Sequence, residues 1–262
     1  MADPQHVAGT FSWFECGSSD AAASKSFYTR LFGWTAEDKP MAGDMGGHYT
    51  MFKLGGEDVA GLYALTGPMA GVPPCWATYV TVANVDETVS KAESLGGKAG
   101  APAMDVPGVG RIAFVQDPTG AMIALFQPGE HRGAGTQGKI PGAFCWSELS
   151  THDTATAGEF YSQLFAWSMK TDASATPYTE FQIGGKSVAG MMELTPRHGD
   201  IPPNWLPYVT VADCEASAAR VTELGGKVVV PPTEVPAVGK FGVFCDPGGA
   251  ALAIIQFAEG PS

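Results

Sequence analysis

Two glutamates, each two residues after a tryptophan, are the residues of this sequence whose types and spacing most suggest chemistry. Trp13 and Glu15 stand in "FSWFE", and Trp146 and Glu148 stand in "FCWSE". Side chains two residues apart on a strand point to the same face. A carboxylate on an inward face is costly unless it is paired or functional. The pattern therefore predicts, twice, an acidic group beside an aromatic ring.

Four further residues extend these two sets. Tyr79 and Tyr208 begin the segment "YVTV" on predicted strands, and we expect them to point the same way as the tryptophans. Arg111 and Lys240 follow "VG" at strand starts, where we expect them at the rim and paired with the two glutamates. The candidate ligand-binding residues are Trp13, Glu15, Tyr79, Arg111, Trp146, Glu148, Tyr208 and Lys240.

An internal duplication accounts for the two sets. The segment "FSWFECGSSDAAASKSFYTRLFGW" returns 133 residues later as "FCWSELSTHDTATAGEFYSQLFAW". The later segments "YTMFKLGGEDVAGLYAL", "PPCWATYVTV" and "VGRIAFVQDPTGAMIALFQ" return after 129 residues. The repeat predicts homologous domains at 8–129 and 142–258, joined by a Gly- and Pro-rich linker at 130–141.

Each half holds two units, with a strand, a helix and several strands in each unit. Asp20 is a predicted helix N-cap, and Gly33 is a predicted helix stop. Ala166 stands where the second half would have its glycine, so we expect that helix to end differently. Alternating segments such as "GRIAFVQDP" and "AMIALFQ" predict strands. We predict an α+β protein of four βαβββ units with cupped mixed sheets.

Four such units in tandem pairs, with "FYxxLFxW" in each first helix and "DPxGxxxxxxQ" at each end, resemble the vicinal oxygen chelate superfamily. This superfamily includes glyoxalase I, extradiol dioxygenases and bleomycin-resistance proteins. The resemblance covers the chain from about Gly9 to Phe257. More narrowly, the layout resembles two-domain glyoxalase-like bacterial proteins.

The resemblance also implies where metal ligands would stand. Family members that use a metal place His, Gln or Glu on inward-facing strand positions. The matching positions here are Trp13, Ala77 and Ala124 in the first half, and Trp146, Leu206 and Ala253 in the second. An indole nitrogen has no lone pair to offer, and Ala and Leu have no donor atom. We therefore predict no metal and no other cofactor, and we interpret the five histidines, the linker residue His131 among them, as solvated loop residues.

Composition restricts the partners. The net charge of −12 and the absence of a Lys/Arg cluster argue against nucleic acid and anionic membrane surfaces. No apolar run is long enough to span a bilayer, and the five cysteines form no C-x-x-C pair, so we expect a cytoplasmic protein. We expect a monomer, with a homodimer as the alternative, because tandem duplication supplies the pairing of units within one chain.

Three interpretations of the two sets remain open at this point. The aromatic residues could simply fill space that no longer holds a metal. They could instead bind a planar or cationic small molecule, with a protective role against a toxic metabolite or antibiotic. Finally, Glu15 or Glu148 could act as a general base with a tyrosine as donor. The main alternative function is an enzyme of the glyoxalase or dioxygenase type, and an interaction scaffold is a third.

Overall fold

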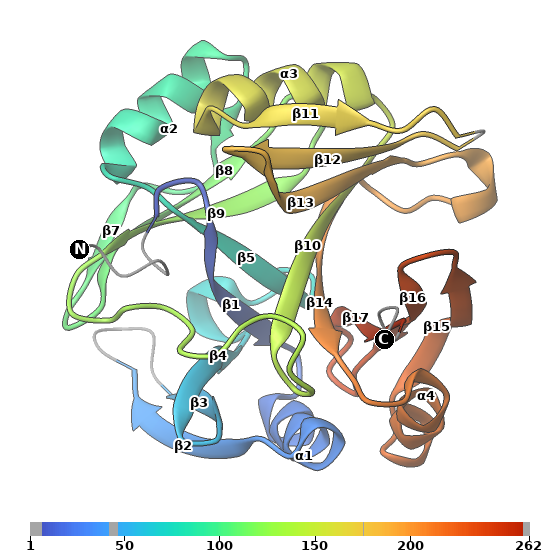
Figure 1. Cartoon of the computed structure of the whole chain (residues 1–262). Helices are drawn as coiled ribbons and strands as arrows, with labels where there is room; N and C mark the ends of the chain where they lie inside the picture. Colours follow the sequence, from blue (N-terminus) through green and yellow to red (C-terminus); the bar gives the residue numbers. More distant parts are fainter. Residues whose placement is uncertain (1–6, 42–46, 175, 259–262) are drawn as a thin grey trace. The chain divides into compact units, whose positions relative to one another are not determined.

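The computed structural model describes residues 7–41, 47–174 and 176–258, which contain four α-helices and seventeen strands (Figure 1). In the first half the elements are β1 Phe11–Ser18, α1 Ala21–Phe32, β2 Thr35–Pro40, β3 His48–Leu54, β4 Glu57–Ala64, η3 Gly67–Met69, β5 Cys75–Thr81, α2 Val85–Ser94, β6 Lys98–Ala99, β7 Met104–Val106, β8 Gly110–Gln116 and β9 Met122–Pro128. In the second half they are β10 Phe144–Thr151, α3 Thr154–Phe165, β11 Ser168–Thr171, β12 Tyr178–Ile183, β13 Lys186–Glu193, η4 Pro196–His198, β14 Asn204–Thr210, α4 Cys214–Glu223, β15 Lys227–Val235, β16 Gly239–Cys245 and β17 Ala251–Phe257. None of the helices within the described ranges is long and apolar enough to cross a membrane.

The strands form two mixed sheets, one from each half of the sequence. The first has the order β2-β3-β4-β1-β5-β9-β8-β6, with β7 also paired to β8, and the second has the order β11-β12-β13-β10-β14-β17-β16-β15. The pairs β1/β4, β5/β9, β10/β13 and β14/β17 are parallel. Parallel neighbours need a crossover connection, which here contains one helix in each module. The predicted α+β architecture of repeated βαβββ modules is confirmed.

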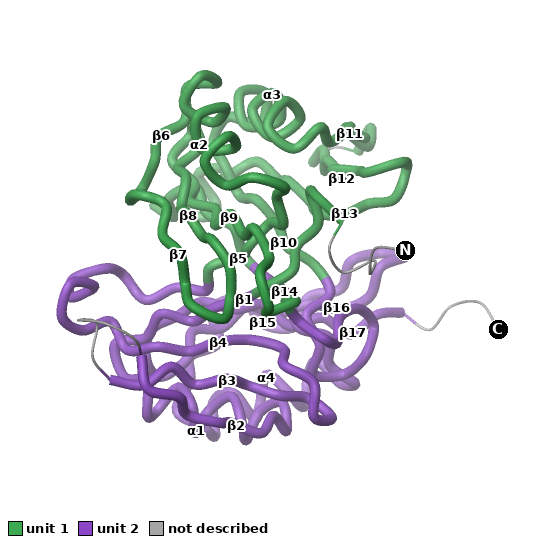
Figure 2. The backbone as a smooth tube through the Cα atoms, turned by 90° about the vertical axis from the view of Figure 1, so that its left-hand side faces the viewer, with its two compact units in different colours: residues 1–13, 77–133, 146–206 green, residues 14–76, 134–145, 207–262 purple. Residues whose placement is uncertain are grey.

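The compact units of the structure combine modules from both halves of the sequence (Figure 2). Unit 1 takes residues 1–13, 77–133 and 146–206, and unit 2 takes residues 14–76, 134–145 and 207–262. Helices α2 and α3 contact each other in unit 1, and α1 and α4 contact each other in unit 2. The boundaries 8–129 and 142–258 follow the sequence repeat and remain a prediction about sequence domains.

Each unit has its own aromatic core, and equivalent residues of the repeat build both. In unit 2 the indole Nε1–H of Trp76 donates to the buried hydroxyl of Tyr28 at 2.7 Å. In unit 1 Trp205 donates to Tyr161 in the same way at 2.8 Å. A buried aromatic side chain removes roughly 150–250 Å² of surface from water, so these rings dominate the packing. The motif "FYxxLFxW" is thus a core motif.

The first helix of each half begins and ends at matching positions. Asp20 and Asp153 cap α1 and α3 by accepting from the backbone N–H three residues on. Gly33 ends α1 in the left-handed conformation, with φ 71°. Ala166 ends α3 in the same conformation, with φ 57°, although alanine is disfavoured there. The prediction that this helix ends differently is wrong, because packing of the repeated core imposes the same turn on both copies.

Candidate functional site

The two candidate glutamates lie on central strands and face glycines. Glu15 is on β1 and Glu148 is on β10, and both residues are half-buried. In the parallel ladders Glu15 is opposite Gly61 of β4, and Glu148 is opposite Gly190 of β13. Because glycine has no side chain, the surface of the sheet beside each carboxylate is open to a group from the next strand.

A tyrosine hydroxyl occupies this opening in each half. Tyr49 Oη of β3 donates to Glu15 Oε1 at 2.7 Å, and Tyr178 Oη of β12 donates to Glu148 Oε2 at 2.8 Å. A Cβ atom added at Gly190 would collide with Tyr178 Oη, and the equivalent glycine of the first half is equally close to its tyrosine. Each Tyr–Glu pair therefore depends on a glycine in the strand between them.

The phenols beside the carboxylates remain hydrogen-bond donors at neutral pH. Burial, and after it the charge of Glu148, raises the pKa of Tyr178. Burial and then the charge of Glu15 also raise the pKa of Tyr63 on β4, which is a different residue from Tyr49, the tyrosine that donates to Glu15. A phenol that resists ionisation next to a carboxylate can hold that carboxylate, but it cannot serve as a base.

The two tryptophans differ in their surroundings. Trp13 is only 6% exposed, and the ring of His131 meets it edge-on, with centroids 4.6 Å apart. Trp146 is partly exposed, and its Nε1–H donates to Tyr178 Oη at 3.0 Å. In unit 1 an indole, a hydroxyl and the Glu148 carboxylate thus form one hydrogen-bonded chain.

His131 lies in a loop as predicted, but it is half-buried and not simply solvated. Its Nε2 atom is buried, and its ring also contacts Phe126 at a centroid distance of 6.3 Å. The Gly and Pro content of the linker predicts a loop but does not tell where the loop lies. Here Gly133, at φ +82°, brings the backbone against Ser12 of β1, where a Cβ atom would collide with the Ser12 carbonyl oxygen.

The predicted tyrosines Tyr79 and Tyr208 lie in the interior. They are 2% and 5% exposed and stand opposite Ala124 and Ala253 in the parallel ladders. The ring of Tyr79 meets the ring of Phe114 edge-on, with centroids 5.8 Å apart. Their burial agrees with the space-filling interpretation, and a ligand would reach them only through side chains closer to the surface.

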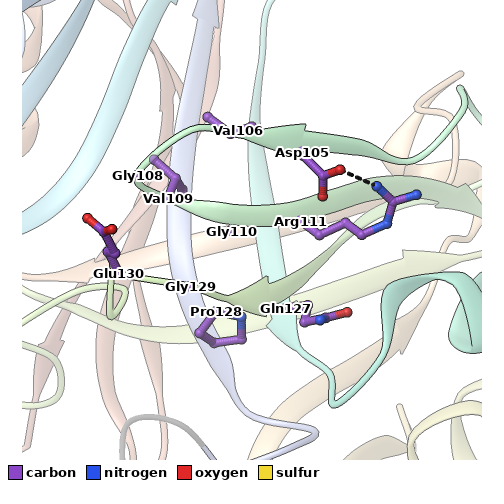
Figure 3. Close-up of a pocket in the computed structure, with 10 residues that line it drawn as sticks. All are labelled: Asp105, Val106, Gly108, Val109, Gly110, Arg111, Gln127, Pro128, Gly129 and Glu130. Carbon is purple, nitrogen blue, oxygen red and sulfur yellow. Dashed lines mark ion pairs between the residues drawn. The ribbon is translucent and has the colours of Figure 1, made fainter.

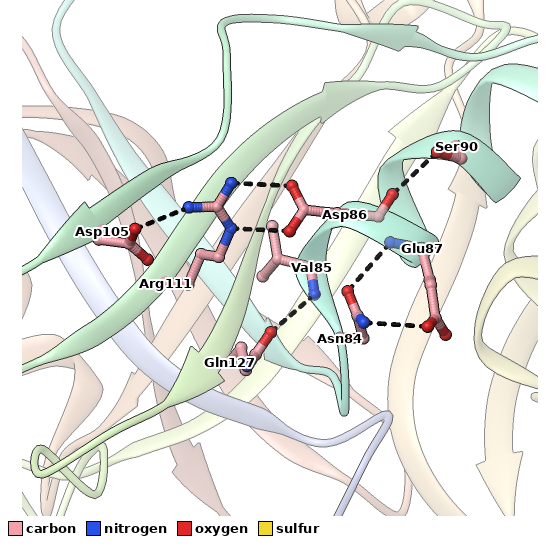
Figure 4. Close-up of polar contacts among 8 residues, drawn as sticks. All are labelled: Asn84, Val85, Asp86, Glu87, Ser90, Asp105, Arg111 and Gln127. Atoms are coloured by element: carbon pink, nitrogen blue, oxygen red, sulfur yellow. Dashed lines mark hydrogen bonds and ion pairs between the residues drawn. The ribbon is translucent and has the colours of Figure 1, made fainter.

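The structure gives Arg111 and Lys240 acidic partners on neighbouring elements. Arg111 Nε and Nη2 donate to the carboxylate of Asp86, in the first turn of α2, at 2.9 and 2.8 Å (Figure 4). A third nitrogen, Nη1, lies 3.0 Å from Asp105 of β7, and Lys240 lies 3.0 Å from Glu215 of α4. The hydrogen bonds from Arg111 hold the pKa of Asp86 below its ordinary value. The expected pairing with Glu15 and Glu148 is thus replaced by pairing with acids at the ends of nearby elements.

A shallow hollow of about 380 Å³ lies beside Arg111 (Figure 3). The turn between β7 and β8 and the start of the linker line it, with Gln127 and Glu130 on one side. The Arg111 guanidinium is already held by two carboxylates, so it offers little to an anion. We therefore place the candidate site at the Trp–Glu positions and not at this hollow.

The positions where the superfamily resemblance implies a metal do not fit one. Ala124 and Ala253 are fully buried and carry no donor atom, and Trp13 and Trp146 present an indole that can only donate. A catalytic metal needs about three protein ligands. Among the described residues, no group of three or more His, Cys, Asp and Glu side chains is arranged to hold a metal ion. No chemical step is assigned to a metal in this protein.

The fold and the site together define a class: tandem βαβββ modules in two mixed sheets, with a carboxylate and an aromatic ring on the central strand of each. The chain belongs to the Glyoxalase/Bleomycin resistance protein/Dioxygenase superfamily, whose sequence profile matches residues 10–125 and 145–254.

Relatives in sequence and structure agree with this assignment. The chain is 38% identical over 255 residues to the Mycobacterium bovis protein named "Putative glyoxylase CFP32", with 96% of both chains covered. It is 34% identical to the anthracycline biosynthesis protein DnrV of Streptomyces peucetius, with 96% of this chain and 94% of that one covered. The fold is similar to that of the 2,3-dioxygenase LapB from Pseudomonas sp. KL28, with TM-score 0.66, 12% identity, and 97% and 95% of the two chains covered. A Mn(II)-bound glyoxalase from Novosphingobium aromaticivorans gives TM-score 0.63 at 16% identity, with 96% and 83% covered.

Tyr49, Tyr178 and the two glycines opposite the glutamates are the site residues that sequence reasoning missed. The repeat contained the signal, because Tyr and Gly are identical in "YTMFKLGGEDVAGLYAL" and "YTEFQIGGKSVAGMMEL". The tyrosines reach the glutamates across the strand that carries the glycines, and no spacing within one segment shows such a contact.

Proposed function

We propose that the protein binds a planar, cationic small molecule without a metal and holds it at a tryptophan and a glutamate. The observation that carries this proposal is the half-buried carboxylate held by a tyrosine hydroxyl, which both halves repeat; in the second half an indole donates to that same hydroxyl. We place this activity in the cytoplasm and expect a monomer to be competent.

Physical chemistry favours a flat cation at such a position. A cation over an indole face gains about 0.5–2 kcal/mol, depending on how much water is removed. A carboxylate has about four acceptor sites, and Tyr178 donates to one of those of Glu148; we propose that an N–H group of the ligand donates to this carboxylate as well. The net charge of −12 adds a long-range attraction for cations.

The names of two relatives bear on the choice between binding and catalysis. DnrV is named for anthracycline biosynthesis, and this name specifies neither binding nor a reaction. CFP32 is named as a glyoxylase, which favours an enzyme. The residues at the positions where the superfamily resemblance implies a metal have no atom that could coordinate one. This supports binding over metal-dependent turnover.

A ligand screen by thermal unfolding tests the proposal. The panel contains 9-aminoacridine as a planar cation, anthraquinone-2-sulfonate as a planar anion, and cyclohexylamine as a cation without a flat ring. At a concentration of 100 times Kd a ligand raises the free energy of unfolding by about 2.7 kcal/mol. We expect the planar cation alone to raise the Tm, and Glu15→Gln with Glu148→Gln to abolish the rise.

A matched control separates the site from net charge. Glu215→Gln with Glu223→Gln removes the same two charges from the exposed face of α4 and should keep the full shift. If no planar cation changes the Tm, or if both double variants respond like the wild type, the binding function is wrong. Turnover of methylglyoxal with a thiol, or of a catechol, would instead favour the enzyme.

A further inference from the structure

We propose that the two halves are not equivalent, and that the chain binds one ligand, a planar nitrogen heterocycle, at Trp146 and Glu148. In the first half the imidazole of His131 already occupies the corresponding place on Trp13. This inference rests on the proposed function and deepens it, because it names the site and the ligand class. We call Trp13, Phe126 and His131 the closed site, and Trp146, Tyr178 and Glu148 the open site; both lie within unit 1.

The closed site shows a flat nitrogen ring seated among aromatic side chains. The His131 ring stands edge-on to Trp13, with an interplanar angle of 84°, and it also contacts Phe126. Trp13 keeps only 6% of its surface exposed under this cover. The His131 imidazole thus shows that an indole at this strand position can pack against a flat ring that contains nitrogen.

The backbone of the linker fixes the imidazole in place. The Gly133 N–H donates to His131 Nδ1 at 3.2 Å, which requires that nitrogen to be unprotonated. Gly133 is buried and rests on the Ser12 carbonyl with φ +82°, a conformation and a closeness that only glycine allows. The position of the His131 ring therefore depends on Gly133 of the linker and on its contact with Ser12.

The open site differs in each of these respects. Trp146 remains partly exposed, and the chain from Trp146 through Tyr178 to Glu148 fixes the indole and the carboxylate relative to each other. In the part of the chain that the structure describes, no ring contacts the Trp146 indole, whereas the His131 ring contacts Trp13. The indole that the protein's own imidazole covers in one half is thus available to an external ring in the other.

The chemistry of the open site specifies the ligand. A flat ring packs against the Trp146 indole, and an N–H or N⁺–H of that ring donates to the Glu148 carboxylate. A protonated heterocycle satisfies both contacts, whereas a flat hydrocarbon satisfies only the first. Benzimidazole is a suitable probe, and indene is its nitrogen-free counterpart of the same shape.

Indole N–H resonances of ¹⁵N-labelled protein test this assignment, because the chain has only six tryptophans. Trp13→Phe and Trp146→Phe identify the two signals. On titration with benzimidazole we expect the Trp146 signal to shift, the Trp13 signal to stay, and calorimetry to give one site per chain. Indene should shift neither signal, and Glu148→Gln should weaken benzimidazole binding by at least tenfold.

A cavity variant completes the experiment. His131→Gly should open the closed site, so that benzimidazole also shifts the Trp13 signal and the stoichiometry rises to two. Arg132→Gly makes the same change to glycine at the neighbouring residue, which is exposed, and should behave like the wild type. The dispersion of each spectrum shows that the variant is folded, and His131→Ala serves if His131→Gly is not.

The outcomes separate this inference from the function on which it rests. A wild-type response at Trp13, or equal responses at both tryptophans, would overturn the inference and leave the binding function standing. A His131→Gly protein that still binds one probe and keeps Trp13 unperturbed would also overturn it. No response at either signal up to the solubility limit of benzimidazole, together with no Tm shift by any planar cation, would overturn both.

Discussion

Replacing Gly190 with alanine should break the Tyr178–Glu148 pair without touching either residue. The added methyl would collide with Tyr178 Oη and would lie 2.9 Å from Trp146 Nε1. The tyrosine ring must therefore swing away from the strand and release Glu148. A residue that forms no hydrogen bond through a side chain would then control the whole open site.

The expected loss of stability follows from three contributions. Forcing an extra methyl into a packed position costs about 1–3 kcal/mol. Losing a hydrogen bond to a charged acceptor costs about 1.5–3 kcal/mol, while alanine returns about 0.5–1 kcal/mol of backbone entropy. Because Tyr178 and Glu148 are only half-buried, we use the low ends, and the net loss is roughly 2 kcal/mol.

Urea unfolding provides the assay. With an m-value of about 2 kcal/mol/M, the unfolding midpoint should fall by about 1 M. Gly242→Ala is the matched control, because it also lies on a strand, β16, and its nearest neighbour would be the Val230 carbonyl at 3.2 Å. That variant should change the free energy of unfolding by less than about 1 kcal/mol.

The same glycine substitution in a Tyr178→Ala protein tests whether the added methyl acts through the tyrosine ring. In a Tyr178→Ala protein the ring that meets the new methyl is gone, so Gly190→Ala should lose most of its cost. If Gly190→Ala is equally destabilising with and without the tyrosine ring, or if it unfolds at the same midpoint as Gly242→Ala, the glycine does not act through the Tyr–Glu pair.

Two further predictions concern stability. Ala166→Gly should raise the free energy of unfolding by about 1 kcal/mol in thermal unfolding, and Gly33→Ala should lower it by a similar amount, because both residues end a helix at positive φ. A Cβ at Gly33 meets nothing within 4 Å, so the change there reports backbone conformation alone. Two changes of the same sign would contradict this expectation. Burial raises the pKa of Asp246, so its stabilising contribution is complete below the ordinary Asp pKa of about 3.9 and is lost as the pH rises through the folded value. Asp246→Asn should therefore gain stability relative to the wild type between about pH 4 and neutral pH in urea unfolding, and a difference that does not change with pH would show that the carboxyl is not perturbed.

The fold could be predicted from the sequence because duplicated residues are core residues. Tyr28 and Trp76 match Tyr161 and Trp205, and the same hydrogen bond joins each pair. Because both copies of the core must be filled in the same way, the aromatic residue, its position in the repeat and its hydrogen-bond partner are the same in both halves. The pairing of modules into compact units could not be predicted, because both halves present equivalent surfaces and no local pattern chooses between them.

The site was only half predictable, for a physical reason that differs from residue to residue. Trp13 and Glu15 follow from strand alternation, which is local. The partner of Arg111 depends on which acid its long side chain reaches first, and the β7–β8 register places Asp105 directly opposite it. The placement of the half-buried His131 ring against Trp13 depends on a glycine two residues later and on a carbonyl of another strand, a contact that alternation and spacing do not encode.

The Tyr–Glu pair is present in both halves, but only one of the two tryptophans that stand two residues before the glutamates is partly exposed. If the pair served ligand binding alone, the first half would have no need of it, because His131 already covers Trp13. If it were only structural, a covered tryptophan would be expected in both halves. We therefore propose two roles for the pair: it ties β3 and β12, each one strand in from a sheet edge, to the central strand across a glycine, and in the second half it also presents Glu148 to a ligand. Glu15→Gln by itself should then weaken folding but leave benzimidazole binding intact, whereas Glu148→Gln should weaken both.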